Sequence, residues 1–364
     1  MLSNVLQASG FGGFVENTDR RTKATSAVVV FAVLAMVTSF LASPGLLAFP
    51  TLLFFAAVAY GWVTDQETTA KLLMFLMTVS TILVLGLIIV YLISRALPVF
   101  ELMGLDLVLK TDVAGASSSN PDLWDPTSDL YSLVPMIWGT LVTTFIAMLI
   151  AAPVGVAGAV FISEIAPPWA REILKPSVET LAGIPSIVYG LLGYTILNSY
   201  VFEEFQTPTF GSLFLVGTVI GAMALPTVVS VAEDAISSVP EPMKSGALAL
   251  GATDWQTIKT VTIPASFSGI SAAVLLGVGR AMGETMAATV IIGHSQKLPD
   301  PLYDVFGNTE TLTTLIASQY GNATPTQLSA LFAAGVVLFV TVLVLSVASQ
   351  LIERRMKRKL GGKE

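Results

Sequence analysis

The chain has 364 residues, of which 54% are hydrophobic and 12% are charged, and its formal net charge is −7. Soluble domains carry about 25% charged residues, so this composition excludes an ordinary soluble protein and indicates an integral membrane protein. The absence of cysteine and the single histidine exclude a disulfide framework, an iron–sulfur cluster and a His-rich metal site. We therefore expect the chain to bind no metal ion and no cofactor.

Eight apolar stretches reach about 20 residues, the length that crosses a membrane as a helix. They are Ala24–Ser43, Leu46–Val63, Leu72–Leu97, Val134–Ile162, Pro176–Leu197, Ser212–Val231, Phe267–Gly293 and Gln327–Ile352. The first two form a hairpin that turns at Pro44–Gly45, and the second is the weakest candidate. A cleaved signal peptide is not expected, because no small-residue cleavage pattern follows the first stretch. The pattern predicts an all-α polytopic membrane protein.

The basic residues predict how the chain is oriented, since Lys and Arg concentrate on the cytoplasmic side. With eight spans and a cytoplasmic N-terminus, fourteen of the 18 Lys and Arg residues lie inside, including the basic tail of residues 354–363. Arg95, Lys110 and Lys297 lie outside, and Arg280 lies within the membrane. We therefore expect both termini in the cytoplasm of a multi-pass protein of the cell membrane, with no nucleic-acid-binding surface.

The segments predicted to be external, Pro98–Leu130 and His294–Thr326, are rich in Asp and Glu, and Glu310 is one of these acidic residues. An acidic exterior repels anions at low salt, whereas molar salt shortens the Debye length to about 3 Å. The bias predicts adaptation to high salt, with ordinary solvated loop charge as the alternative. His294, at the membrane boundary, is expected to be an interfacial residue rather than a ligand.

Arg280 and Glu284 interrupt the apolar run Phe267–Gly293. Each charge at mid-membrane depth costs roughly 2.5–3.5 kcal/mol. In a continuous helix the four-residue spacing places both side chains on one face. Gly279 and Gly283 form a small-xxx-small pair that allows another helix to approach. The pattern predicts an anion site on a transport pathway; the alternative is a structural ion pair that fixes helix packing.

The cytoplasmic loop Ser237–Ala265 is unusually apolar and is predicted to form two short helices. The first follows Pro242 and ends near Gly251, and the second is opened by Thr253 with Gln256 in a capping-box pattern. Trp255 is a candidate anchor for a partner protein. The alternative is a lid that folds onto its own membrane domain.

The spacing within this loop resembles the EAA loop of ABC-importer permeases. After Ser245, Gly246 and Ala247 come three residues and then Gly251. Nine intervening residues lead to Val261, and one further residue leads to Ile263-Pro264. The leading glutamate of the family is Ser245 here. The resemblance implies that the loop docks on a separate ATP-binding subunit. In agreement, the chain contains no G-x-x-x-x-G-K-[ST] sequence.

Three further segments resemble the PstC-type permeases of phosphate ABC importers. They are the signature segment Gly279–Ala287, which continues to Ile291-Ile292-Gly293, then Gly139–Thr143, and Ile184–Gly190. Met286-Ala287 follows the PstC form rather than the form of the sister subunit PstA. The similarity covers roughly Leu72 to Met356 and leaves out the leading hairpin.

The resemblance implies a MetI-like core of about six transmembrane helices, preceded by an accessory hairpin over residues 1–64. The first family helix and its external loop span residues 65–130, the core spans 131–356 with the coupling loop at 237–265, and 357–364 form the tail. It also implies a PstA-like sister permease, two ATP-binding subunits and an extracytoplasmic phosphate-binding protein as partners, within a lipid membrane. The chain would form half of the pore.

Within that pore Arg280 is the first candidate to contact phosphate, because a guanidinium matches oxyanions in charge and geometry. Glu284 would either orient Arg280 or disfavour a second negative charge and so aid phosphate release. The Thr285 hydroxyl would donate to the anion or to a carbonyl of its own helix. Ser186 and Tyr189, beside Pro185, are expected at a helix kink that lines the pathway or merely bends the helix.

Other functions remain as alternatives. One is an ABC permease for sulfate, molybdate or tungstate. Another is a stand-alone ion-coupled carrier, which predicts paired inverted repeats that are not found. An enzyme is disfavoured, since the chain has no nucleophile–His pair, no H-E-x-x-H motif and no clustered carboxylates, and we assign no catalytic residue.

Overall fold

The computed structural model describes residues 20–111 and 122–359, which are mostly helical. Five helical stretches are long and apolar enough to cross a membrane, and a sixth crossing exists if a helix pair bent by 85° forms one span. Ala24–Phe40 and Ala48–Thr64 are shorter apolar helices. The predicted all-α membrane fold is confirmed, while the total of eight spans and their orientation stay predictions.

The chain forms two compact units that divide between Val90 and Tyr91. The functional division at residues 64, 130 and 356 stays a prediction. The first unit holds α3 (Arg20–Ala42), a 3-10 turn (Pro44–Leu46), α4 (Ala48–Thr64) and the start of α5 (Gln66–Met103). The turn predicted at Pro44–Gly45 is confirmed. Val29, Ala57 and Leu72, one from each helix, form its small buried core.

The second unit is built around α7 (Val134–Val160), α11 (Leu213–Ser237) and α14 (Ile263–Gly283). Its helices approach closely at glycine. A Cβ on Gly217 would lie 2.7 Å from Cβ of Ile146, and one on Gly155 would lie 2.8 Å from Val228. Such close backbone approach is the usual way in which helices associate inside a membrane, where packing replaces the hydrophobic effect.

Helix α5 continues through Pro98 to Met103, so the prediction that this span ends at Leu97 is wrong. Proline removes a backbone donor and bends the helix. Ser329 bridges the disturbed turn, because its hydroxyl donates to the Arg95 carbonyl (2.8 Å) and accepts from the Val99 N–H (3.1 Å). This side chain comes from α17 (Pro325–Lys359) and ties the two helices together.

One end of the second unit carries α6 (Asp106–Leu109), β1 (Trp124–Asp125), β2 (Leu130–Tyr131) and α16 (Leu312–Gln319) with a 3-10 turn (Tyr320–Asn322). The strands pair antiparallel, with Trp124 opposite Tyr131. Hydrogen bonds from Thr127, then from Ser128, lower the pKa of Asp125 in the connecting turn. The predicted external loops are therefore substantially folded.

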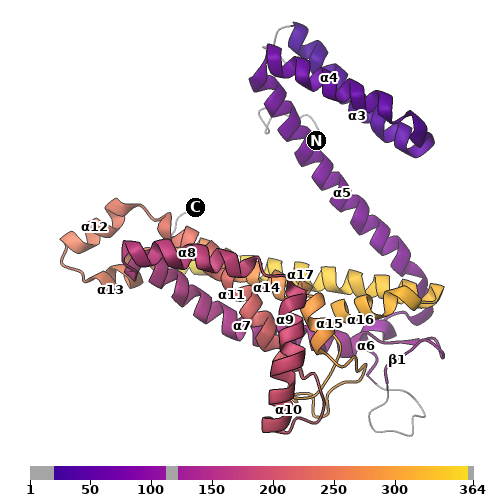
Figure 1. Ribbon diagram of the computed structural model, residues 1–364, viewed down its shortest axis with the longest axis vertical. Helices are drawn as coiled ribbons and strands as arrows, with labels where there is room; N and C mark the ends of the chain where they lie inside the picture. Colours follow the sequence, from indigo (N-terminus) through magenta and orange to yellow (C-terminus); the bar gives the residue numbers. More distant parts are fainter. Residues whose placement is uncertain (1–19, 112–121, 360–364) are drawn as a thin grey trace. The chain divides into compact units, whose positions relative to one another are not determined.

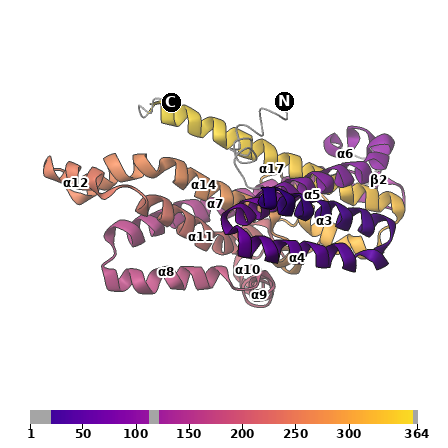
Figure 2. The same cartoon turned by 90° about the horizontal axis from the view of Figure 1, so that it is seen from above.

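The opposite end carries α12 (Glu241–Ala249) and α13 (Asp254–Thr257), which project beyond the other helices (Figure 1, Figure 2). Helix α8 (Pro168–Ala182) follows a π-helical turn, η2 (Phe161–Ile165), and is succeeded by α9 (Ser186–Leu192), a π-helical segment (Gly193–Asn198) and α10 (Ser199–Phe205). The stretch predicted as one span over Pro176–Leu197 is not one straight helix, because the chain bends by 85° at residues 183–185. That it crosses the membrane once stays a prediction.

Candidate functional site

The signature segment Gly279–Ala287 contains a helix break. Helix α14 ends at Gly283, Glu284 has extended backbone angles (φ −68°, ψ 125°), and α15 (Met286–Ile291) begins two residues later. The expectation that Arg280 and Glu284 share one face of a continuous helix is therefore wrong. The span predicted over Phe267–Gly293 is likewise two helices.

The polar atoms at this break are satisfied locally. The Glu284 carboxylate accepts from the Ala287 N–H at the start of α15 (3.0 Å), and the Glu284 carbonyl accepts from the Thr313 hydroxyl (2.8 Å). The Thr285 hydroxyl donates to the Gly283 carbonyl (3.2 Å). A carboxylate at a helix N-terminus also complements the positive end of the helix dipole. Glu284 thus caps α15 in this conformation.

Replacement of Glu284 separates its capping role from its charge. Glu284→Ala removes the acceptor, so we expect a loss of about 0.5–2 kcal/mol in stability, the usual effect of losing a cap. Glu284→Gln keeps an acceptor oxygen and is expected to retain most of that stability. Thermal unfolding of the purified variants measures the difference, and equal losses in both would refute the capping role.

Arg280 lies on an uncovered face of α14. Its side chain is exposed, and no carboxylate in residues 20–111 and 122–359 forms an ion pair with it. A Cβ on Gly279 or Gly283 would meet no atom within 4 Å. The small-xxx-small pair therefore contacts no described helix of this chain. The face is free for another chain or for an aqueous path.

Ser186 and Tyr189 lie on α9, directly after the bend. Pro185 immediately precedes α9 and does not lie within a helix. The prediction that it kinks a continuous helix is therefore wrong. The Tyr189 hydroxyl donates weakly to the Leu181 carbonyl across the bend (3.4 Å). A Cβ on Gly190 would lie 2.9 Å from Cα of Ala287. The structure thus packs α9 against α15 and brings these two segments together.

The third resembling segment, on α7, holds the end of the 294–326 loop. The Thr140 hydroxyl accepts from the Leu312 N–H (3.0 Å). A Cβ on Gly139 would lie 2.3 Å from the Glu310 carbonyl oxygen, so only glycine fits without a shift. Glycine and threonine at these positions therefore fix the start of α16.

Glu310, in the loop predicted to be external, is fully buried, so its charge does not contribute to an acidic surface. Its carboxylate lies 2.6 Å from Nδ1 of His294 and accepts from the Ser318 hydroxyl (3.0 Å) and the Gln296 amide (3.3 Å). His294 has positive φ (54°). These hydrogen bonds hold separate turns of the 294–326 loop together. No local pattern predicts them, because the partners come from different turns of an irregular segment.

The predicted helices of the 237–265 loop are confirmed. Helix α12 is followed by Gly251 with φ of 87°, a left-handed conformation that glycine adopts readily. Thr253 and Gln256 form the predicted capping box at the start of α13. The second helix is longer than expected, because it continues through a π-helical turn, η4 (Ile258–Thr262), into α14. Pro264 lies at the junction of η4 and α14, inside this continuous helical stretch.

The tip of this loop exposes large apolar side chains. Leu250 is 91% exposed and Trp255 is 61% exposed, with Met243 and Leu248 exposed beside them. Ser245, Gly246 and Ala247 lie on α12, while Ile263 and Pro264 lie at the base. Contiguous apolar exposure of this kind marks an interaction site. Within the described chain nothing folds over this tip, so the alternative of a lid is not supported.

An ion pair that sequence reasoning missed joins this loop to the end of α7. Nζ of Lys244 on α12 lies 2.6 Å from the Glu164 carboxylate in η2, and both side chains are less than 15% exposed. Arg171 on α8 donates to the carbonyls of Ile162 (2.9 Å) and Ser163 (2.6 Å). These groups border a polar cavity of about 560 Å³ between α12 and η2. Eighty residues separate the paired charges, so spacing alone cannot reveal them.

Comparison with known proteins identifies the family. Residues 153–358 match the family described as "Binding-protein-dependent transport system inner membrane component". The chain belongs to this family. It is an ABC-transporter permease subunit and a multi-pass protein of the cell membrane. It is not an enzyme, since ATP hydrolysis belongs to a separate ATPase subunit.

Curated relatives agree with this assignment. The permease is 36% identical over 258 residues to "Phosphate transport system permease protein PstC" of Haemophilus influenzae, which covers 65% of this chain and 81% of that protein. It is 33% identical over 294 residues to "Probable phosphate transport system permease protein PstC" of Methanocaldococcus jannaschii, and the match covers 75% of this chain and 88% of that protein. It is 43% identical over 204 residues to "Probable ABC transporter permease protein YqgH" of Bacillus subtilis, covering 55% and 65%.

A solved structure supports the fold. A chain of a bacterial alginate ABC transporter superposes with a TM-score of 0.52 at 14% identity, covering 80% of this permease and 98% of that chain. At this identity the likeness concerns the fold alone. The family match, which assigns the chain to the ABC-transporter permeases, argues against a stand-alone ion-coupled carrier.

Proposed function

We propose that this permease forms half of the membrane pore of an ATP-driven importer of inorganic phosphate. The observation that carries the proposal is Arg280, which is exposed on α14, forms no ion pair with a carboxylate of the described residues, and lies in the segment that resembles PstC-type permeases. An unpaired guanidinium in a membrane helix is costly, so it calls for an anion or another chain beside it. Several curated relatives carry phosphate transport in their names, which favours phosphate among the oxyanions.

The uncovered face with Gly279 and Gly283 suits a pore wall shared with a sister permease. Glycine has only a hydrogen atom as its side chain, so the backbone of α14 is accessible at these two positions. The anion can therefore pass close to α14 while Arg280 neutralises its charge. Glu284 acts by holding the break between α14 and α15 in place, so it positions Arg280 through the backbone. The Thr285 hydroxyl, now bonded to Gly283, becomes a donor to phosphate once it rotates.

Ser186 and Tyr189 belong to the same pathway through the packing of α9 against α15. Tyr189 is partly buried beside α15, and Ser186 lies at the first position of α9. Motion of α8 relative to α9 at the 85° bend would move both residues with respect to Arg280. The bend is therefore the proposed hinge between outward and inward access.

The apolar tip with Trp255 docks into a cleft on a separate ATPase subunit. Large aromatic side chains that are exposed in the free subunit are the usual anchors of such interfaces. Ser245 replaces the glutamate of the EAA pattern, and its hydroxyl donates to the Glu241 carbonyl within α12 (3.0 Å). Apolar contact, rather than a glutamate-specific one, would hold the ATPase. Two such subunits, a PstA-like sister permease and an extracytoplasmic phosphate-binding protein complete the transporter.

Stimulation of ATP hydrolysis tests the proposal. The assembled transporter in nanodiscs is mixed with the binding protein loaded with phosphate, or with the protein incubated with sulfate, molybdate or tungstate. We expect ATP hydrolysis by the transporter to rise several-fold with the phosphate-loaded binding protein and not with the binding protein incubated with the other oxyanions. Stimulation by another oxyanion and not by phosphate would assign the permease to that anion instead.

A further inference from the structure

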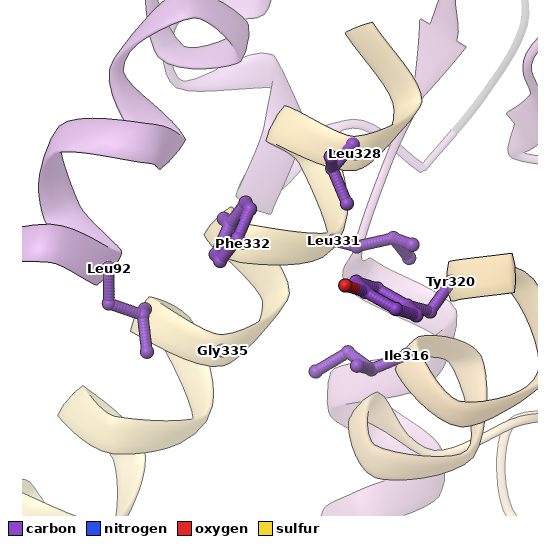
Figure 3. Close-up of a pocket in the computed structure, with 7 residues that line it drawn as sticks. All are labelled: Leu92, Ile316, Tyr320, Leu328, Leu331, Phe332 and Gly335. Carbon is purple, nitrogen blue, oxygen red and sulfur yellow. The ribbon is translucent and has the colours of Figure 1, made fainter. Parts of the chain in front are cut away.

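An apolar pocket lies at the predicted external end of the second unit, where α5, α16 and α17 meet. Its volume is about 200 Å³. Figure 3 shows side chains from all three helices turned toward it, with the Tyr320 hydroxyl as the one polar group among the labelled side chains. Besides Gly335, the pocket is lined by Leu92, Ile316, Tyr320, Leu328, Leu331 and Phe332.

A cation is held beside this pocket. Arg95 lies one helical turn after Leu92, and its Nε donates to the Tyr91 hydroxyl (3.2 Å) while the guanidinium lies 5.3 Å from the Tyr91 ring centre. The Tyr91 ring in turn packs edge-on against Phe332, with ring centres 5.9 Å apart. Ser329 fixes the Arg95 backbone. The Arg95 guanidinium therefore contacts Tyr91, and Tyr91 contacts Phe332 in the pocket wall.

Arg95 is exposed and has no carboxylate partner in the part of the chain that the structure describes. Tyr320, which lines the pocket, and Tyr91, which contacts Arg95, are both more than half exposed. Exposed tyrosines and an arginine at the end of apolar spans are typical of the membrane–water boundary. An apolar pocket beside an available cation at that depth complements a molecule with a hydrocarbon chain and an anionic head.

We propose that this pocket binds one acyl chain of an anionic phospholipid, whose phosphate contacts Arg95. A free phosphate ion would pair with the guanidinium but would not fill the apolar pocket. An apolar helix of the sister permease would fill the pocket but would leave the guanidinium without an anion. An anionic phospholipid makes both contacts. It also explains why a pocket of this size stays open between packed helices, since a fluid chain fills it in the membrane.

The test measures lipid that stays bound to the assembled transporter. The purified complex is incubated with phosphatidylglycerol or with phosphatidylcholine of the same acyl chains, and bound copies are counted by native mass spectrometry. Wild type is expected to retain one phosphatidylglycerol at this site, with about fivefold preference over phosphatidylcholine, the effect of one basic residue near an anionic head group.

Matched variants locate the site. Leu328→Trp fills the pocket and should remove one retained lipid of either kind, whereas Leu343→Trp, on an exposed position of α17 outside the pocket, should remove none. Arg95→Gln should abolish the preference for phosphatidylglycerol, and Arg95→Lys should preserve most of it. Lipid retention unchanged by Leu328→Trp, or equally reduced by Leu343→Trp, would overturn the proposal. So would a wild-type complex that retains no lipid, since the sister permease would then cover the pocket.

Discussion

Arg280→Ala is expected to reduce phosphate uptake by about 10- to 100-fold. Hydrogen bonds to a charged group contribute roughly 1.5–3 kcal/mol each, and every 1.4 kcal/mol corresponds to a factor of ten. Because Arg280 is exposed and forms no ion pair with a described carboxylate, its removal leaves no buried charge behind. The assembly of the complex should therefore be unaffected, and the loss should fall on transport.

Two further variants make this expectation specific. Arg280→Lys keeps the charge but loses the planar, bidentate geometry, so uptake should fall between wild type and Arg280→Ala. Arg354→Ala removes an exposed arginine at the end of α17, far along the chain from the signature segment, and should leave uptake unchanged. Labelled phosphate in proteoliposomes provides the readout. Full uptake by an assembled Arg280→Ala transporter would make this residue structural.

Lys244→Glu is expected to uncouple ATP hydrolysis from transport. The substitution places a second carboxylate beside Glu164, whose side chain is only 11% exposed. Breaking a largely buried pair costs up to about 3–5 kcal/mol, because the remaining charge loses its partner. Helix α12 would then separate from η2, and movement of the docked ATPase would no longer reach α7. We expect uptake per ATP hydrolysed to fall at least tenfold.

The reverse substitution tests the same link from the other side. Glu164→Lys should uncouple the transporter as strongly, and the double variant Lys244→Glu/Glu164→Lys should restore most of the transport, because the pair re-forms with its charges exchanged. Lys259→Glu, in the same loop but outside this pair, serves as the control. A double variant no better than either single one would show that the ion pair does not carry the coupling.

Hydropathy predicted the helices because apolar length is a local property of the chain. Most predicted spans contain a helix, although α5, α11 and α17 each continue past the predicted end. The capping box at Thr253 and the turn at Gly251 were also predicted, because each depends on residues that are neighbours in the sequence. The breaks at Gly183–Pro185 and at Glu284 were missed, since the sequence stays apolar on both sides of each break. What ends α14 is a carboxylate that bonds to the next helix, a contact that hydropathy does not register.

Contacts between distant segments account for the other corrections. Ser329 allows α5 to continue through Pro98, and the turns around His294 bury Glu310. The Lys244–Glu164 pair spans eighty residues. The residues named from the signature segments lie on α9, on α14 and in the break between α14 and α15. Their direct contact with an anion stays a proposal. The predicted adaptation to high salt also stays a prediction.

The most direct test of phosphate import is uptake itself. This permease is reconstituted in liposomes with its sister permease and ATPase subunits, and labelled phosphate is followed with ATP, with and without the binding protein and with sulfate as competitor. We expect uptake that requires both ATP and the binding protein and is not reduced by excess sulfate. Uptake of sulfate or another oxyanion in the absence of phosphate uptake would contradict the proposed substrate.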